Sequence, residues 1–410
     1  MKKSDILFRL RSRPNMIKVR DFQVKCYAFN GPFVAHKTPV VILADSLMRP
    51  TFFAEEVEKL LKDRPLIVID TTTMRSNNNQ ETISDLSTSL KHVLEGLGVE
   101  RSIVMGMGLS FPLAYQYAIQ YEKFCDRLII GGVTSGLRDS IKIQIQQQIE
   151  YLNLGDQKKF AQGLSLLFSN FNFKDRMDRS ESYRTMFENY LRKLDTSLVQ
   201  TLKTELEQYS QANLATGLVT CPALIIQAEY DSVTTCHEGF QFTKKFQQPQ
   251  LAILECLDHL APLQNKKVMV RLLRRFLSDE SLSRMTGVEL YNKKNYPLKR
   301  MQLTPRYQFQ QVGFIDAGNG VLIPVEVVDI NRNGCRLFTT FADHKDLKGR
   351  THFKLTIPDR DLETEILLFD RGEGGSMRAV FVHDDTEQFK RFENVIELIA
   401  MEFEEVPLIA

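Results

Sequence analysis

The stretch RSIVMGMGLSFPLAYQY, from Arg101 to Tyr117, decides the fold of this chain. It contains Ile103, Val104 and Met105, an apolar run without alternation that predicts a strand buried on both faces. Closely spaced glycines follow and predict a sharp turn, and a helix is expected from Phe111 onward. A buried strand that turns directly into a helix is typical of a parallel sheet covered by helices.

The turn has the spacing of a nucleophile elbow, whose usual form is G-x-S-x-G. Gly106 occupies the first small position and Ser110 the last, so the position of the nucleophile falls on Gly108. A glycine has no side chain that can attack a carbonyl. Ser110 is the obvious substitute, but it follows the apex by two residues. Its hydroxyl is therefore expected to point into a helix-packing contact that demands a small residue.

Strands and helices alternate in both directions from this stretch. Apolar or partly alternating runs predict strands at residues 22–28, 39–43, 65–70, 127–132, 222–227 and 250–255. Apolar residues at helical spacing predict helices at 53–61, 83–97 and 265–277. Residues 134–216 contain no strand-like run, so three or four helices inserted as a cap are expected there. For residues 21–278 we predict a capped α/β domain with a mostly parallel sheet.

The two ends of the chain have a different character. Residues 1–20 hold seven basic residues and one acidic residue, which predicts a basic segment with a solvated surface. Residues 279–300 are polar and predict a linker. In residues 301–410, short alternating segments separated by turns predict a small antiparallel β-barrel, followed by a helix at 387–401.

The composition of the chain limits the classes of protein to which it could belong. The chain has 410 residues, 43% of them hydrophobic, and a net charge of +2, so a soluble protein of more than one domain without a nucleic-acid partner is expected. No stretch predicts a secretory signal or a transmembrane helix. The six cysteines are scattered without a CxxC pair. This pattern favours reduced thiols in the cytoplasm and no metal site.

Residues 21–278 resemble the α/β-hydrolase superfamily in the order and spacing of their elements as well as in the elbow. In that family the order along the chain is nucleophile, acid, histidine. The segment CPALIIQAEYD, which ends at Asp231, matches the context of the acid, and LDHLAP places His259 on the base. The resemblance implies that Asp231 and His259 are vestigial triad positions, with Gly108 at the position of the nucleophile.

Two loops depart from the family pattern. The loop after the first buried strand, which commonly carries His-Gly, reads Ala44-Asp45-Ser46. A carboxylate there is unfavourable for a developing oxyanion. The loop after Asp70 also lacks the usual glycines. Several losses together favour a protein without hydrolase activity, whose former pocket holds a small apolar ligand or docks a protein. An apolar helical stripe could line that pocket, and it consists of Leu164, Leu167, Phe168 and Phe171.

Residues 300–402 resemble the PilZ domain, a bacterial barrel that in many members binds cyclic di-GMP. The run DINRNG matches its D-x-S-x-x-G turn and supplies Asp329, Asn331 and Gly334. The RxxxR element lacks one arginine in either of two registers. Arg306 best fits the second arginine, which places Gln302 on the first, whereas starting at Arg306 places Gln310 on the second. Lys299 and Arg300 lie a short reach upstream and could substitute. By resemblance, the expected cyclic di-GMP site consists of Arg300, Gln302, Arg306, Asp329, Asn331 and Gly334.

The two resemblances together suggest a bacterial cytoplasmic signalling protein. By resemblance, such architectures act in motility, biofilm formation and virulence. An esterase or thioesterase regulated by the barrel is the first alternative. A scaffold or adaptor that binds no nucleotide is the second. No cofactor is expected, and cyclic di-GMP is the candidate ligand.

Overall fold

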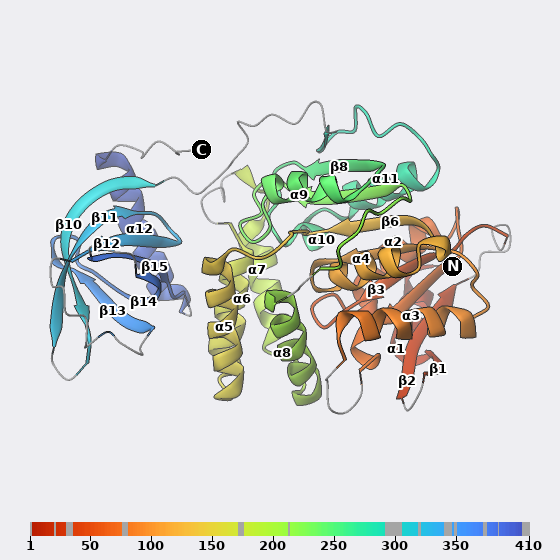
Figure 1. Cartoon of the computed structure of the whole chain (residues 1–410), viewed down its shortest axis with the longest axis horizontal. Helices are drawn as coiled ribbons and strands as arrows, with labels where there is room; N and C mark the ends of the chain where they lie inside the picture. The colour runs from red at the N-terminus through yellow and green to blue at the C-terminus, as the bar shows by residue number, and fades with distance from the viewer. Residues whose placement is uncertain are drawn as a thin grey trace. The chain divides into compact units, whose positions relative to one another are not determined.

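The computed structural model describes most of the chain. It describes residues 2–19, 22–29, 36–75, 81–170, 176–211, 214–291, 306–318, 321–339, 347, 351–371, 375–383 and 385–403. The chain divides into two compact units (Figure 1). The first unit comprises residues 1–137, 168–183 and 193–301, and the second comprises 138–167, 184–192 and 302–410. The domain boundaries expected from the sequence stay a prediction.

Among the described residues, the first unit is built on a nine-stranded sheet with the order β1-β2-β4-β3-β5-β6-β7-β8-β9. The strands from β3 to β8 pair in parallel, while β1, β2 and β9 pair antiparallel with their neighbours. Their bounds are β1 Asn15–Val19, β2 Phe22–Phe29, β3 Val40–Ala44, β4 Leu66–Asp70, β5 Ser102–Met107, β6 Cys125–Gly131, β7 Ala223–Ala228, β8 Pro249–Leu254 and β9 Val288–Tyr291.

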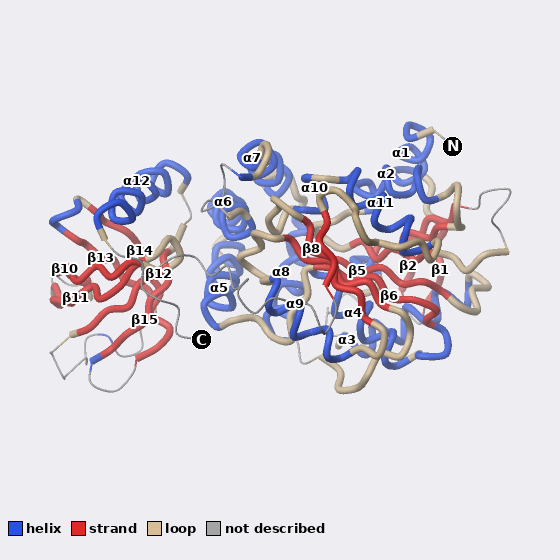
Figure 2. The backbone as a smooth tube through the Cα atoms, turned by 90° about the horizontal axis from the view of Figure 1, so that it is seen from above, coloured by secondary structure: helices blue, strands red, loops and turns tan. Residues whose placement is uncertain are grey.

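Helices cover both faces of this sheet (Figure 2). On one face α1 (Lys3–Ser12), α2 (Ala54–Leu60) and α11 (Lys266–Leu277) lie side by side over the largest apolar cluster of the unit. On the other face lie α3 (Ile83–Gly96), α4 (Phe111–Gln120) and α9 (Cys236–Phe242). Phe242 of α9 contacts Phe111 and Tyr115 of α4. Burial on both faces explains why β3, β4 and β5 are apolar without alternation.

Among the described residues, four α-helices lie between β6 and β7 in the chain, where the sequence predicted three or four. They are α5 (Asp139–Asn153), α6 (Gln157–Phe168), α7 (Ser180–Leu191) and α8 (Thr196–Gln211). The buried face of α8 repeats at helical spacing and includes one acid, Glu205, beside Leu202, Leu206 and Tyr209. A short helix, α10 (Ala261–Gln264), precedes α11.

Two segments of the first unit contain elements that were not expected from the sequence. The basic segment 1–20 contains α1 and β1, and Ile6 and Leu10 of α1 are buried in the core. α1 holds as many charged residues as apolar ones, four of each, so its packing face did not stand out in the sequence. The expected linker contains β9, which pairs with β8 at the edge of the sheet. A four-residue edge strand has too little periodicity to be recognised.

The second unit contains a closed antiparallel barrel of six strands in the order β10-β11-β12-β15-β14-β13. The strands are β10 Tyr307–Asp316, β11 Leu322–Ile330, β12 Gly334–Phe338, β13 His352–Ile357, β14 Leu362–Arg371 and β15 Ser376–Phe381. The helix α12 (Thr386–Glu402) packs on the barrel core through Phe392, Ile396 and Ile399, and Asp385 caps its N-terminus. The predicted fold class, a mostly parallel α/β sheet with a C-terminal antiparallel barrel, is confirmed.

None of the described helices has both the length and the apolar character needed to cross a membrane.

Candidate functional site

The elbow has the backbone of a strand, a tight turn and a helix. β5 ends at Met107, residues 108–110 form one turn of 3-10 helix, and α4 starts at Phe111. A Cβ atom at Gly106 would lie 2.6 Å from the Ser110 carbonyl oxygen and 2.7 Å from Ala114 Cβ, so only glycine fits there. This close approach is the reason that the motif begins with a small residue.

Gly108 stands at the apex of the elbow. Its φ is +54°, in the left-handed region that glycine adopts without strain. A Cβ atom added to Gly108 would meet no other atom within 4 Å. The apex therefore faces open space, and Gly108 has no side chain that could react with a molecule in that space.

Ser110 does not face that space. Its Oγ accepts a hydrogen bond from the Met107 amide at 3.0 Å and lies 3.1 Å from the Leu43 carbonyl oxygen. The residue is 3% exposed. The hydroxyl thus links the end of β5 to β3, in line with the inward orientation expected from the sequence.

Asp231 and His259 are brought together across 28 residues of chain. Asp231 follows β7, His259 precedes α10, and Asp231 Oδ2 lies 2.8 Å from His259 Nδ1. Asp231 Oδ1 accepts the amides of Val233 and Thr234, each at 2.8 Å. The ring of Phe168 packs on the imidazole at a centroid distance of 4.4 Å. The carboxylate is thereby fixed from several sides and holds the imidazole in one orientation.

The imidazole lies at the same end of the sheet as the elbow. Gly132, which follows β6, has a φ of +65°. A Cβ atom at Gly132 would lie 3.7 Å from Gly108 Cα and also 3.7 Å from His259 Cε1. The structure thus places the three predicted positions, Gly108, Asp231 and His259, around one point.

The electrostatics of this pair are those of a buried ion pair. Burial alone would lower the pKa of His259, but the charge and hydrogen bond of Asp231 outweigh burial, and the pKa is raised. Burial alone would raise the pKa of Asp231, but His259 and the Thr234 hydrogen bonds hold that pKa below its ordinary value. The neighbouring Asp258 accepts the Leu260 and Asn170 amides, and burial raises its pKa to about 6.

The loop after β3 is closed to an oxyanion. Asp45 Oδ1 accepts the amides of Leu47 at 2.9 Å and Met48 at 2.8 Å, and Glu205 accepts the amide of Ser46 at 3.1 Å. Three successive donors of this loop are therefore bound to carboxyl groups. Burial, and then the charge of Glu205, raise the pKa of Asp45 to about 8. Glu205 is also buried, and burial raises its pKa.

The second candidate site lies on the barrel. The Arg306 guanidinium forms an ion pair with Asp329 Oδ1, and Arg336 Nε lies 3.0 Å from Asp329 Oδ2. Burial, and the nearby charges of Arg336 and Arg378, lower the pKa of Arg306 although Cys335 acts in the opposite sense. One carboxylate thus holds two guanidinium groups at the end of β11.

The predicted turn after β11 is present. Asn331 Oδ1 accepts the amides of Asn333 and Gly334, each at 2.9 Å. Gly334 does not adopt a positive φ, so the backbone conformation of the turn does not require a glycine there. A Cβ atom there would lie 2.2 Å from the Ala379 carbonyl oxygen of β15, so glycine is needed for close strand contact. Arg300, Gln302 and Phe171 lie outside the described residues.

Two residues of these sites were missed in the sequence. Glu205 interrupts the apolar stripe of α8, and a lone acid at a core position was the available signal. Arg336 is seven residues beyond Asp329 and becomes its partner through the β11–β12 pairing, where Asp329 stands opposite Arg336. Among the described residues, no group of three His, Cys, Asp or Glu side chains is arranged to hold a metal ion.

The chain matches no family model, and no curated protein sequence matches it. Solved structures do match. MGS-M2, an α/β-hydrolase enzyme from a Medee basin deep-sea metagenome library, is 17% identical, with a TM-score of 0.57, over 65% of this chain and 98% of that one. The enol-lactonase from Burkholderia xenovorans LB400 is 14% identical, with a TM-score of 0.52, over 64% of this chain and 100% of that one.

A thermophilic esterase from Thermogutta terrifontis is similar to the same degree. It is 14% identical, with a TM-score of 0.52, over 65% of this chain and 99% of that one. Identities this low establish the fold and nothing about activity. The N-terminal part of this chain therefore has the α/β-hydrolase fold, and a closed six-stranded antiparallel barrel follows it.

Proposed function

We propose that this chain is a signalling protein in which a catalytically inactive α/β-hydrolase-fold domain is coupled to a PilZ-type barrel that binds cyclic di-GMP. The observation that carries the first half is the elbow. Its apex, Gly108, faces open space with no side chain, and the hydroxyl that the elbow does carry, on Ser110, is bound to β3 and β5. Asp231 and His259 then have no nucleophile to activate.

The loop after β3 supports the same conclusion. Acyl transfer needs amide donors that point at the developing oxyanion. The amides of Ser46, Leu47 and Met48 instead donate to Glu205 and Asp45. The domain has therefore lost both the attacking group and the donors that this loop supplies in active relatives.

The barrel half of the proposal rests on the cluster around Asp329. Arg306 and Arg336 share this one carboxylate, so the group keeps an excess positive charge. Guanidinium groups bind phosphates in a bidentate manner and stack on guanine rings. A cyclic dinucleotide would take Arg306 as a phosphate partner, while Asp329 and Asn331 would hydrogen-bond a guanine edge. Arg300 and Gln302 would complete the site by resemblance.

Calorimetric titration of the full chain with cyclic di-GMP tests the barrel half. We expect saturable heat that is lost in Arg306→Ala and in Asp329→Ala, and no heat with GTP. An absence of heat at high protein concentration would reject the sensor function and favour the scaffold alternative.

The retained Asp231–His259 pair favours one other function, a hydrolase regulated by the barrel. Incubation with short- and medium-chain p-nitrophenyl esters, together with labelling by a serine-reactive phosphonate, separates the two functions. We expect neither turnover nor labelling. Turnover that disappears in His259→Ala would show that the domain is an esterase or thioesterase.

A further inference from the structure

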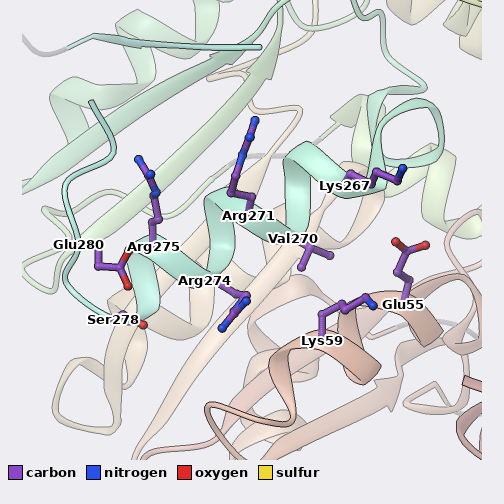
Figure 3. Close-up of a pocket in the computed structure, with 9 residues that line it drawn as sticks. All are labelled: Glu55, Lys59, Lys267, Val270, Arg271, Arg274, Arg275, Ser278 and Glu280. Carbon is purple, nitrogen blue, oxygen red and sulfur yellow. The ribbon is translucent and has the colours of Figure 1, made fainter. Parts of the chain in front are cut away.

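A basic pocket lies on the α/β unit between α2 and α11, on the helical layer that also contains α1. Its volume is about 490 Å³ (Figure 3). Five cationic side chains line it, against the carboxylates of Glu55 and Glu280, which leaves an excess of three positive charges. The cations are Lys59, Lys267, Arg271, Arg274 and Arg275.

Two of the arginines, Arg271 and Arg275, are held in place without being neutralised. Arg271 donates to the Thr286 carbonyl oxygen at 2.6 Å, and Arg275 donates to the carbonyl oxygens of Ser281 and Ser283. A neutral carbonyl orients a guanidinium but leaves its charge available. Arg274 is the exception, because its Nε lies 2.7 Å from Asp63 Oδ2.

The two lysines of the pocket have weak ion pairing or none. Lys59 has its nearest carboxylate, Glu58, at 3.9 Å. Within the part of the chain that the structure describes, Lys267 makes no ion pair. Both residues are exposed, so both ammonium groups are available to a ligand.

One side of α11 carries a row of like charges. Its sequence, KKVMVRLLRRFL, holds five basic residues and no acid. Lys267, Arg271 and Arg275 follow at i, i+4 and i+8, where like charges repel, and Lys267 stands at the positive end of the helix dipole. The core requires only the other face of the helix. That face consists of Met269, Val270, Leu272, Leu273, Phe276 and Leu277.

The row Lys267, Arg271 and Arg275 concentrates positive charge along one side of the pocket, and such a concentration of charge attracts anions. Among the described residues, no aromatic side chain lines the pocket, so no stacking platform for a nucleobase is present there. Arginine and lysine side chains are the usual partners of phosphate oxygens. We propose that this pocket binds a phosphate-bearing anion with at least two negative charges, either a free polyphosphate or the headgroup of an anionic phospholipid.

Titration of the full chain with inorganic tripolyphosphate, followed by calorimetry, tests this site. We expect Lys267→Glu/Arg271→Glu to weaken binding at least tenfold. The matched control, Lys18→Glu/Lys123→Glu, makes the same change of charge at two exposed lysines outside the pocket and should bind like the parent chain. A second pocket variant, Lys59→Ala/Lys267→Ala, leaves the arginine–carbonyl contacts intact and should weaken binding in the same direction.

Sedimentation with phosphatidylglycerol vesicles is the second experiment, and it tests whether the pocket binds a lipid headgroup. Vesicle binding that is lost only in the pocket variants, without tripolyphosphate binding, assigns the site to a lipid headgroup. Equal losses in pocket and control variants, or no binding in either experiment, would overturn the proposal. Loss of tripolyphosphate binding in Arg306→Ala, together with unchanged binding in both pocket variants, would assign the anion site to the barrel and overturn the proposal. The proposal is independent of cyclic di-GMP binding, so each can fail alone.

Discussion

The elbow site and the barrel site each contain a carboxylate paired with a cation. They differ in how deeply the charges are buried and in how many cations surround the carboxylate. The Asp231–His259 pair is almost fully buried, with side-chain exposures of 3% and 8%. It shares its surroundings with further buried carboxyl groups, Asp45, Asp258 and Glu205. In the barrel, Asp329 is matched by two guanidinium groups, and about half of the Arg336 side chain is exposed.

This difference shows that two sites with similar ion pairs can differ in how accessible their charges are to solvent. At the elbow, Asp231 and His259 are close together and almost fully buried, while the apex residue, Gly108, has no side chain. At the barrel, the Arg306 and Arg336 side chains around Asp329 are partly exposed to solvent. Four substitutions test the comparison, in order of decreasing expected effect.

The largest effect is expected for His259→Ala, which leaves Asp231 as an unpaired buried charge. We expect a loss of about 3 kcal/mol in the free energy of unfolding near pH 6. The pKa of His259 is raised, so the contribution of the pair is lost as pH rises through that pKa. The pKa of Asp231 is lowered, so the contribution is also lost as pH falls through that one. The destabilisation should therefore be greatest between about pH 4 and 6.5.

Calorimetric unfolding across pH measures this window. Asp231→Asn/His259→Ala serves as the control, because it removes the orphaned charge and should recover part of the loss. A loss that does not change with pH would show that packing on Phe168, and not the ion pair, explains the effect.

The next effect concerns stability: removing the charge of a carboxyl group should stabilise the chain at Asp45 and destabilise it at Asp329. The pKa of Asp45 is raised to about 8, so the wild-type chain loses stability as pH rises from about 4 to about 8. Asp45→Asn keeps an oxygen for the Leu47 and Met48 amides and removes this titration. We expect the variant to be more stable than the parent by on the order of 2 kcal/mol at pH 8, and by little at pH 5.

Asp329→Asn is the matched control in the barrel. It withdraws the negative charge from Arg306 and Arg336, so it should destabilise the chain at both pH values. Thermal unfolding of Asp45→Asn and Asp329→Asn at pH 5 and pH 8 measures both changes in stability. A fall in stability for Asp45→Asn at pH 8 would mean that Asp45 is ionised and stabilising in the folded protein.

A smaller effect is expected for Arg306→Ala. Asp329 keeps Arg336 as a partner, and about a third of the Arg306 side chain is exposed, which weakens the ion pair through solvent screening. We expect a loss of about 1.5 kcal/mol, roughly half that of His259→Ala. Urea unfolding measures both variants side by side. A loss for Arg306→Ala equal to that for His259→Ala would mean that the barrel pair is as isolated from solvent as the sheet pair.

The smallest effect is expected for Gly108→Ser. A serine at a φ of +54° costs about 1 kcal/mol in backbone strain, although its side chain has space. Hydrolysis of p-nitrophenyl butyrate should stay at the level of Gly108→Ala, which carries the same strain without a hydroxyl. Turnover above that level would show that the rest of the hydrolase site is intact.

Much of this molecule could be predicted because its signals are local. The continuous apolar strands, the glycines of the elbow and the alternation of the barrel each follow from a short window of sequence. The segment 1–20 and β9 escaped prediction because their burial depends on neighbours that are distant in the chain. Glu205 and Arg336 escaped for the same reason, since each acquires its role from a partner on another element.

The sequence by itself determined the α/β class, the barrel and the sharp turn between β5 and α4. It did so because backbone sterics and apolar periodicity act over a few residues. Only the tertiary structure decided how far apart the charged groups lie and how much water reaches them. Those two quantities govern whether a carboxyl group is ionised, whether a cation is available and whether Gly108 faces open space.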